Sequence, residues 1–193
     1  MRNAPAVAVV VLVAALTSLV ASGCGVGAEQ SAGAATAARP TTFETTLYFL
    51  TSDQSAPIGV RRSLERTSPF AIQAMRALLA GRTQAEKERG LRSAIPDGTR
   101  LVALRIVPNG LAVVNLTGLP ANGSPVDRVR VITQIARSLI GLSGIQQVRL
   151  RNDGKPWGLW LMSGGTADTA YGYRELLGFT GVGGAGGSFA ALP

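Results

Sequence analysis

The chain contains no histidine, and this absence narrows the chemistry that it can perform. Histidine is the commonest general base and the commonest metal ligand in proteins. Without it, the chain cannot form a Ser-His or Cys-His catalytic triad. Its single cysteine, Cys24, also excludes an intrachain disulfide and a cysteine-based zinc site. Any folded domain must therefore be held together by its own core.

The chain also lacks an apolar run long enough to span a membrane. The uninterrupted run from Ala6 to Leu16 falls short of the roughly 20 residues that a spanning helix needs. It follows a positive N-terminus that includes Arg2, which is the layout of a secretory signal. The run leads into Val20-Ala21-Ser22-Gly23-Cys24, which resembles the bacterial lipobox, where a cysteine is acylated and becomes the new N-terminus.

This resemblance implies that residues 1–23 are a lipoprotein signal peptide and that Cys24 carries lipid, including palmitate. The protein would then sit on the extracytoplasmic face of the cell membrane. A single acyl chain binds membranes with an association constant of only about 10⁴ M⁻¹, whereas two or more chains anchor a protein stably. The alternative is a free or buried cysteine behind an ordinary signal. Residues 24–42 are small and polar, and predict a flexible spacer.

The charge balance is strongly basic, with a formal net charge of +8. Such a charge is typical of proteins that bind nucleic acid, an anionic membrane or an acidic polymer. Export excludes nucleic acid as a partner. Two interpretations of the charge remain. The chain binds an anionic surface in the cell envelope, or the charge is a simple composition bias, which agrees with the absence of any Lys/Arg run longer than two residues.

The remaining pattern predicts alternating strands and helices. Ser68-Pro69 and Ser124-Pro125 each supply an N-cap followed by proline at the first helical position. Asn109-Gly110 is the strongest hairpin signal in the chain. Residues 52–68 are polar and predict a loop. The expected strands cover 43–51, 101–107, 111–117, 148–151 and 157–162, and the expected helices cover 69–80 and about 125–140.

The order is β-α-β-β-α-β-β within one domain, residues 43–162. Two amphipathic helices packed on one face of a mainly antiparallel sheet would bury both apolar stripes, which predicts an α+β fold. Residues 163–193 are glycine-rich and are expected to be mostly disordered. Within them, residues 171–179 have enough apolar groups to dock a short turn.

The ordered motifs of this domain resemble the GerMN domain of spore-germination proteins. The motifs are Leu78-Leu79-Ala80-Gly81, Ser93-Ala94-Ile95-Pro96-Asp97-Gly98-Thr99, the hairpin Asn109 to Leu116, and Ile145 through Val148 to Gly154-Lys155-Pro156. The resemblance covers roughly residues 43 to 160. Two positions depart from the family pattern, with Asn115 in place of a usual aspartate and Arg82 in place of a common proline.

The resemblance implies a non-catalytic extracytoplasmic domain with a fold like that of ring-building motifs. Its expected role is a binding or assembly module in the cell envelope, with no cofactor and no metal. The expected partner is an envelope protein or a second copy of the chain. The alternative is an enzyme acting on envelope carbohydrate with two carboxylates, which needs no histidine.

Several side chains are candidates for a working surface. Arg149 and Arg151 alternate with Val148 and Leu150, so both guanidinium groups should lie together on one strand face. Arginine suits bidentate contact with carboxylates and phosphates. A solvated face, or one covered by the C-terminal segment, is the alternative. Trp157 and Trp160 are expected to point to opposite faces of the last strand.

Asp97 and Asp153 both precede a glycine in a turn. Aspartate is favoured at such positions because its side chain bonds to the local backbone. A structural role in the turns is therefore expected for both carboxylates, rather than a catalytic one.

Overall fold

The computed structural model describes residues 41–161 and 165–178. The expected signal peptide, Cys24, nearly all of the spacer and residues 179–193 lie outside this part of the chain. The strands are β1 (Thr42–Leu50), β2 (Pro57–Glu65), β3 (Arg100–Val107), β4 (Leu111–Thr117), β5 (Gln147–Asn152), β6 (Lys155–Pro156) and β7 (Ala170–Gly172). The α-helices are α1 (Phe70–Leu79), α2 (Gln84–Glu88), α3 (Pro125–Leu139) and α4 (Tyr173–Gly178), with 3₁₀ turns η1 (Pro108–Gly110) and η2 (Leu142–Gly144).

The strands form two sheets. β1 and β2 make an antiparallel hairpin of their own. In the second sheet, β3 and β4 are antiparallel, β4 and β5 are parallel, and both β6 and β7 pair with β5. The parallel pair follows from the chain order, since α3 is the crossover that carries the chain from β4 back to the start of β5.

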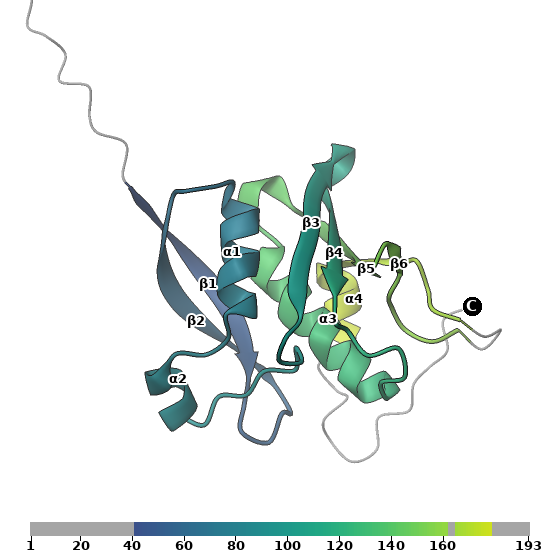
Figure 1. Cartoon of the computed structure of the whole chain (residues 1–193), viewed down its shortest axis with the longest axis horizontal. Helices are drawn as coiled ribbons and strands as arrows, with labels where there is room; N and C mark the ends of the chain where they lie inside the picture. Colours follow the sequence, from purple (N-terminus) through teal and green to yellow (C-terminus); the bar gives the residue numbers. More distant parts are fainter. Residues whose placement is uncertain (1–40, 162–164, 179–193) are drawn as a thin grey trace, which may run out of the picture. The chain divides into compact units, whose positions relative to one another are not determined.

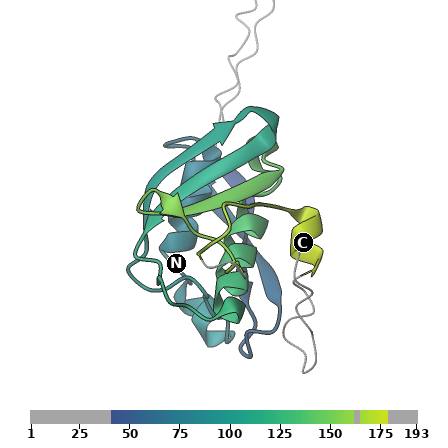
Figure 2. The same cartoon turned by 90° about the vertical axis from the view of Figure 1, so that its right-hand side faces the viewer.

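The helices α1 and α3 lie between the two sheets (Figures 1 and 2). α3 contacts β1 of the small sheet as well as β5 and β7 of the large one, and α1 contacts β1, β2 and β3. A helix covered on several sides should be buried nearly all round. α3 meets this expectation, because ten of its residues, from Arg128 to Leu139, are buried, polar Thr133, Gln134 and Ser138 among them.

The α+β prediction is confirmed, as is the central hairpin. Asn109 and Gly110 have φ angles of 67° and 71°, the left-handed values that a tight hairpin turn needs. The two strands contribute unequally to the core. β4 buries Ala112, Val114 and Leu116, whereas Val102 and Ile106 of β3 stay exposed.

The first half of the domain departs from the prediction in three places. Residues 57–65, expected to be loop, form β2, in which half-buried and exposed residues alternate against β1. A helix that the sequence did not predict, α2, lies within residues 82–99 and begins with a capping box, Thr83 and Glu86. At α1 the N-cap is Pro69 rather than Ser68, and Ser68 Oγ has no hydrogen-bond partner.

The end of the domain also differs. Residues 157–161 form no strand beyond an isolated bridge between Trp160 and Thr166, so the expected strand at 157–162 is wrong. The boundary at residue 162 is too early, because β7 and α4 follow it and bury Tyr171 and Leu176 in the same core. Of the expected tail, residues 163–164 and 179–193 lie outside the described part of the chain.

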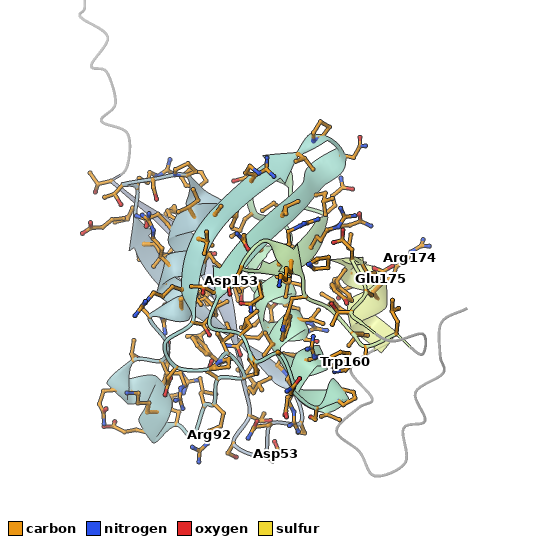
Figure 3. All side chains as sticks on the ribbon, turned by 45° about the vertical axis from the view of Figure 1, so that its right-hand side comes forward. Asp53, Arg92, Asp153, Trp160, Arg174 and Glu175 are labelled. Carbon is orange, nitrogen blue, oxygen red and sulfur yellow. The ribbon has the colours of Figure 1, made fainter. Side chains whose placement is uncertain are left out.

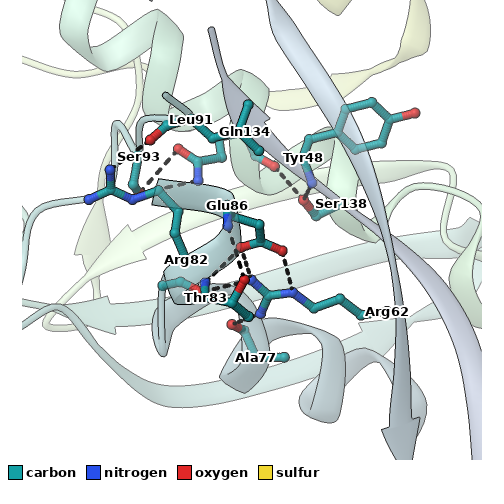
Figure 4. Close-up of polar contacts among 11 residues, drawn as sticks. Tyr48, Arg62, Ala77, Arg82, Thr83, Glu86, Leu91, Ser93, Gln134 and Ser138 are labelled. Carbon is teal, nitrogen blue, oxygen red and sulfur yellow. Dashed lines mark hydrogen bonds and ion pairs between the residues drawn. The ribbon is translucent and has the colours of Figure 1, made fainter. Parts of the chain in front are cut away.

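Buried polar contacts fix the loops at the end of the domain that carries α2 (Figure 4). Arg62 on β2 donates to Glu86 and to the carbonyls of Ala77 and Gly81. Gln134 of α3 is fully buried, and its Oε1 accepts from the backbone N–H of Ala94 at 2.7 Å. These bonds attach α2 and the 93–96 loop to the helical layer, so both are held in place.

Candidate binding surfaces

The outer face of the large sheet, opposite the helices, carries a row of basic side chains. Cα pairing aligns Arg105 on β3 with Val113 on β4, and Val113 with Arg149 on β5. Directly paired residues share a face, and adjacent strands lie about 4.8 Å apart, so Arg105 and Arg149 stand about 10 Å apart. Arg151 follows on the same face one pleat further along β5. We call Arg105, Arg149 and Arg151 the basic face.

The structure places Arg149 and Arg151 together on one face, with Val148 and Leu150 buried on the other. Both arginines also contact one carboxylate, that of Asp168, at 3.6 Å and 3.1 Å. Their side chains keep 31% and 33% exposure. The C-terminal segment therefore covers the pair in part and offsets some of its charge, as the alternative interpretation of these residues expected.

Arg105 is a member of this face that the sequence interpretation missed. It is exposed, and it reaches the face only through the register of the hairpin, two strands away from β5. Applying the Asn109-Gly110 turn as a register constraint would have found it.

Asn115 lies in the neighbouring row, next to Arg151. Its Oδ1 accepts a hydrogen bond from the backbone N–H of Gly154 at 2.9 Å. The turn at Asp153-Gly154, where Asp153 has a φ of 51°, is thereby tied to β4. This contact gives the asparagine a structural role at a position where the family pattern has aspartate.

A second candidate site lies at the first turns of α3, where Arg128 is sandwiched between two indole rings. Its guanidinium carbon lies 4.7 Å from the ring centroid of Trp157 and 4.3 Å from that of Trp160. The expectation that these tryptophans point to opposite faces is therefore wrong. A cation between two aromatic faces is a favourable arrangement, and it draws both rings to the same place.

Arg128 is only 2% exposed, and none of the ion pairs among the described residues includes it. Its Nη atoms donate to the carbonyls of Gly158, at 2.8 Å, and Ala121. Burial lowers the pKa of its guanidinium, and the nearby Tyr171 acts in the opposite direction. The group nevertheless stays protonated. A positive charge is thus buried here without a carboxylate partner.

A hollow of about 230 Å³ opens beside this sandwich. Its apolar lining is Ala94, Pro96, Pro120, Val131 and Trp157, and its charged lining is Asp127, Arg128 and Arg130. Figure 3 shows the labelled Trp160 beside α3; its side chain is 42% exposed. We refer to this cavity as the hollow.

The described residues hold no group of three or more Asp, Glu, His or Cys side chains placed to bind a metal. Within the same part of the chain, no helix is both long and apolar enough to cross a bilayer. The lining of the hollow includes one carboxylate, that of Asp127. These features define an α+β domain with a basic sheet face and a small, partly apolar hollow.

Comparison with known proteins assigns the family. The family model for Germane, described as sporulation and spore germination, matches residues 46–157, so the chain belongs to this family. No curated protein matches the chain.

The chain is also similar to solved structures. The first GerMN domain of the sporulation protein GerM from Bacillus subtilis is 21% identical, with a TM-score of 0.50, over 69% of this chain and 99% of that one. The tandem GerMN domains of the same protein give 22% identity and a TM-score of 0.48, over 66% of this chain and 45% of that one. A protein described as a lipoprotein from Clostridium perfringens is 18% identical, with a TM-score of 0.45, over 69% and 89% of the two chains.

Proposed function

We propose that this protein is a lipoprotein of the cell envelope, anchored through Cys24, whose Germane domain binds an acidic surface without catalysing a reaction. The partner is an envelope protein or a second copy of the chain, and an anionic membrane surface offers the same charge. Membership of the sporulation and spore germination family supports an envelope role. The sequence before and at Cys24 supports the anchor.

The observation that carries the binding role is the basic face. Arg105, Arg149 and Arg151 lie on one side of a sheet whose other side is packed against helices. The strands fix the direction in which each side chain leaves the sheet, so all three arginines point to the same side before any partner arrives. Arginine in such an array recognises carboxylates and phosphates through paired hydrogen bonds.

An enzyme acting on carbohydrate is less well supported. Such an enzyme needs two carboxylates about 5 to 9.5 Å apart in a cleft, and the lining of the hollow supplies one. Glu86, the buried acid, is engaged by Arg62 and by the backbone of Thr83. The geometry therefore favours binding over carboxylate catalysis.

The anchor is tested by replacing Cys24 with alanine in the full chain. We expect the variant to lose its lipid mass and its processing by the lipoprotein signal peptidase, which mass spectrometry of the purified protein detects. Retention of the same lipid mass by the variant would exclude Cys24 as the anchor.

The binding surface is tested by charge reversal of the full chain. Arg149→Glu combined with Arg151→Glu, and separately Arg105→Glu, should weaken association with vesicles of phosphatidylglycerol or with a partner surface, most strongly at low salt. Each basic group near an anionic surface contributes about 1 kcal/mol. Arg89→Glu is the matched control, since Arg89 is exposed but lies at the end of α2. Equal association of all folded variants at low and moderate salt would discard the basic face.

A further inference from the structure

The hollow shares no residue with the basic face. It lies between the 93–96 loop, the 120–123 loop and the first turns of α3. We propose that it binds an acidic side chain carried on an extended segment of a partner protein. The observations that support this are its volume, its charge, its rigidity and its position.

The volume argues against a free cofactor. Sites for small molecules enclose about 300–1,000 Å³, whereas the hollow encloses about 230 Å³. That space suits one or two side chains. Trp160, which is 42% exposed, lies beside the hollow because its indole N–H donates to the carbonyl of Gly123, a lining residue, at 3.3 Å. The flat surface of Trp160 extends the contact area beyond the hollow, as a segment longer than one side chain requires.

The charge of the lining selects an acidic occupant. Arg128 and Arg130 line the hollow against a single carboxylate, that of Asp127. Asp127 accepts from Arg130 at 3.3 Å, so Arg128 is left without a carboxylate among the described residues. Arg130 has five N–H groups, and two of them donate, one to the carbonyl of Gln54 and one to the carboxylate of Asp127. An incoming carboxylate would meet a net positive lining with free donors.

The walls of the hollow are fixed in place. Gln134 holds Ala94 through its backbone N–H at 2.7 Å. The indole N–H of Trp157 donates to the carbonyl of Pro120 at 3.1 Å, and Arg128 holds Ala121. Binding to a site that is already ordered avoids the cost of ordering its loops. Exposed tryptophan and arginine are also the residues that most often carry binding energy at protein interfaces.

The hollow lies away from the point where the chain enters the domain. The chain enters at Thr42, the start of the nine-residue strand β1, which is about 30 Å long. Gln54, in the loop after the other end of β1, lines the hollow. Figure 3 shows the neighbouring Asp53 at the end of the domain opposite the turn of the β3–β4 hairpin. The hollow therefore lies near the opposite end of β1 from Thr42, where this strand begins.

The test is a selection of random peptides displayed on phage against the full chain in non-ionic detergent. Selected peptides should contain Asp or Glu next to an apolar residue, and a copy with Gln or Asn at that position should bind more weakly. The chain has two tryptophans, and both touch Arg128. Binding at the hollow should therefore change the intrinsic fluorescence, which gives the affinity directly.

Variants of opposite sign separate recognition from structure. Arg130→Gln should weaken binding of the selected peptides about tenfold or more, the equivalent of one charge-assisted hydrogen bond. Asp127→Asn, which removes the repelling carboxylate, should strengthen it, while Arg89→Gln, at the C-cap of α2, should leave it unchanged. Failure to select any peptide, selection without acidic residues, or equal affinities for Arg130→Gln and Arg89→Gln would overturn the proposal. Free glutamate binding as tightly as the peptides would contradict the extended segment.

Discussion

Replacing Glu86 with alanine should destabilise the domain more than any single change on its surface. Glu86 is 4% exposed and accepts from Arg62 Nε at 3.1 Å and from the N–H of Thr83 at 2.8 Å. Removing one member of a buried ion pair costs about 3–5 kcal/mol, because the other charge is left behind. Arg62 is 15% exposed and keeps the carbonyls of Ala77 and Gly81 as acceptors. The lower end, about 3 kcal/mol, is therefore expected.

The stability lost in Glu86→Ala should depend on pH, and it should be smaller at low pH. Burial raises the pKa of Glu86, but hydrogen bonds from Arg62 and Thr83 outweigh burial, and the pKa lies below its ordinary value of 4.5. A carboxylate with a lowered pKa stabilises the folded state above the pKa of the unfolded chain, and this contribution is lost as the pH falls through the folded pKa. The difference between the native chain and Glu86→Ala should be full at pH 7 and should shrink below about pH 4.5.

Urea denaturation followed by circular dichroism measures both effects. Glu88→Ala is the matched control, because Glu88 lies on the same short helix, is exposed and accepts a hydrogen bond from the exposed side chain of Gln84. The control should lose about 0.5 kcal/mol or less. Equal midpoints for Glu86→Ala and the control at pH 7 would show that the ion pair of Glu86 does not stabilise the domain. A difference that stays constant down to pH 3 would exclude the lowered pKa of Glu86 as its source.

Three further changes test other parts of the structure. Gly110→Ala should lower the free energy of unfolding by about 1–3 kcal/mol in urea denaturation, because its φ is +71° and its Cβ would lie 2.6 Å from the carbonyl oxygen of Gly144. The control Gly81→Ala, at φ +83° with open space around it, should lower it by about 1 kcal/mol. Equal losses of stability for the two variants would contradict the predicted clash. Arg128→Met should cost about 2–4 kcal/mol and shift tryptophan emission to the red as Trp160 is released; unchanged emission would contradict the sandwich. Asp168→Asn should raise association with phosphatidylglycerol vesicles at low salt, since it frees Arg149 and Arg151, and no change would show that the ion pairs do not limit binding.

The parts of the fold that the sequence predicted well have local causes. Asn109-Gly110 defines its turn within two residues, and Ser124 caps α3 by accepting from the N–H of Asp127, three residues away. The capping box of Thr83 and Glu86 is equally local but was overlooked, because the helix that it starts is only five residues long. β2 could not be predicted because Gly59 and the paired arginines interrupt the alternation of apolar and polar residues in its sequence. Such an interruption is expected in a strand that is half exposed.

The parts that could not be predicted depend on contacts between distant residues. Trp157 and Trp160 leave the strand conformation where Arg128, about 30 positions earlier, lies between their rings. Asp168 meets Arg151 across 17 positions. No local sequence pattern indicates which distant residues will form such contacts. The arginine pair could be placed on one face from its alternation, but its acidic partner and the addition of Arg105 required the sheet.

In-cell photocrosslinking shows whether the basic face meets a partner in the cell envelope. A photoreactive amino acid is placed at position 105 in one strain and at position 89 in another, each in the full chain with Cys24 intact. We expect a discrete crosslinked adduct at position 105 that is lost when Arg149 and Arg151 are also changed to glutamate, and no adduct at position 89. The same adducts at both positions, or an adduct at 105 that survives the double charge reversal, would contradict it.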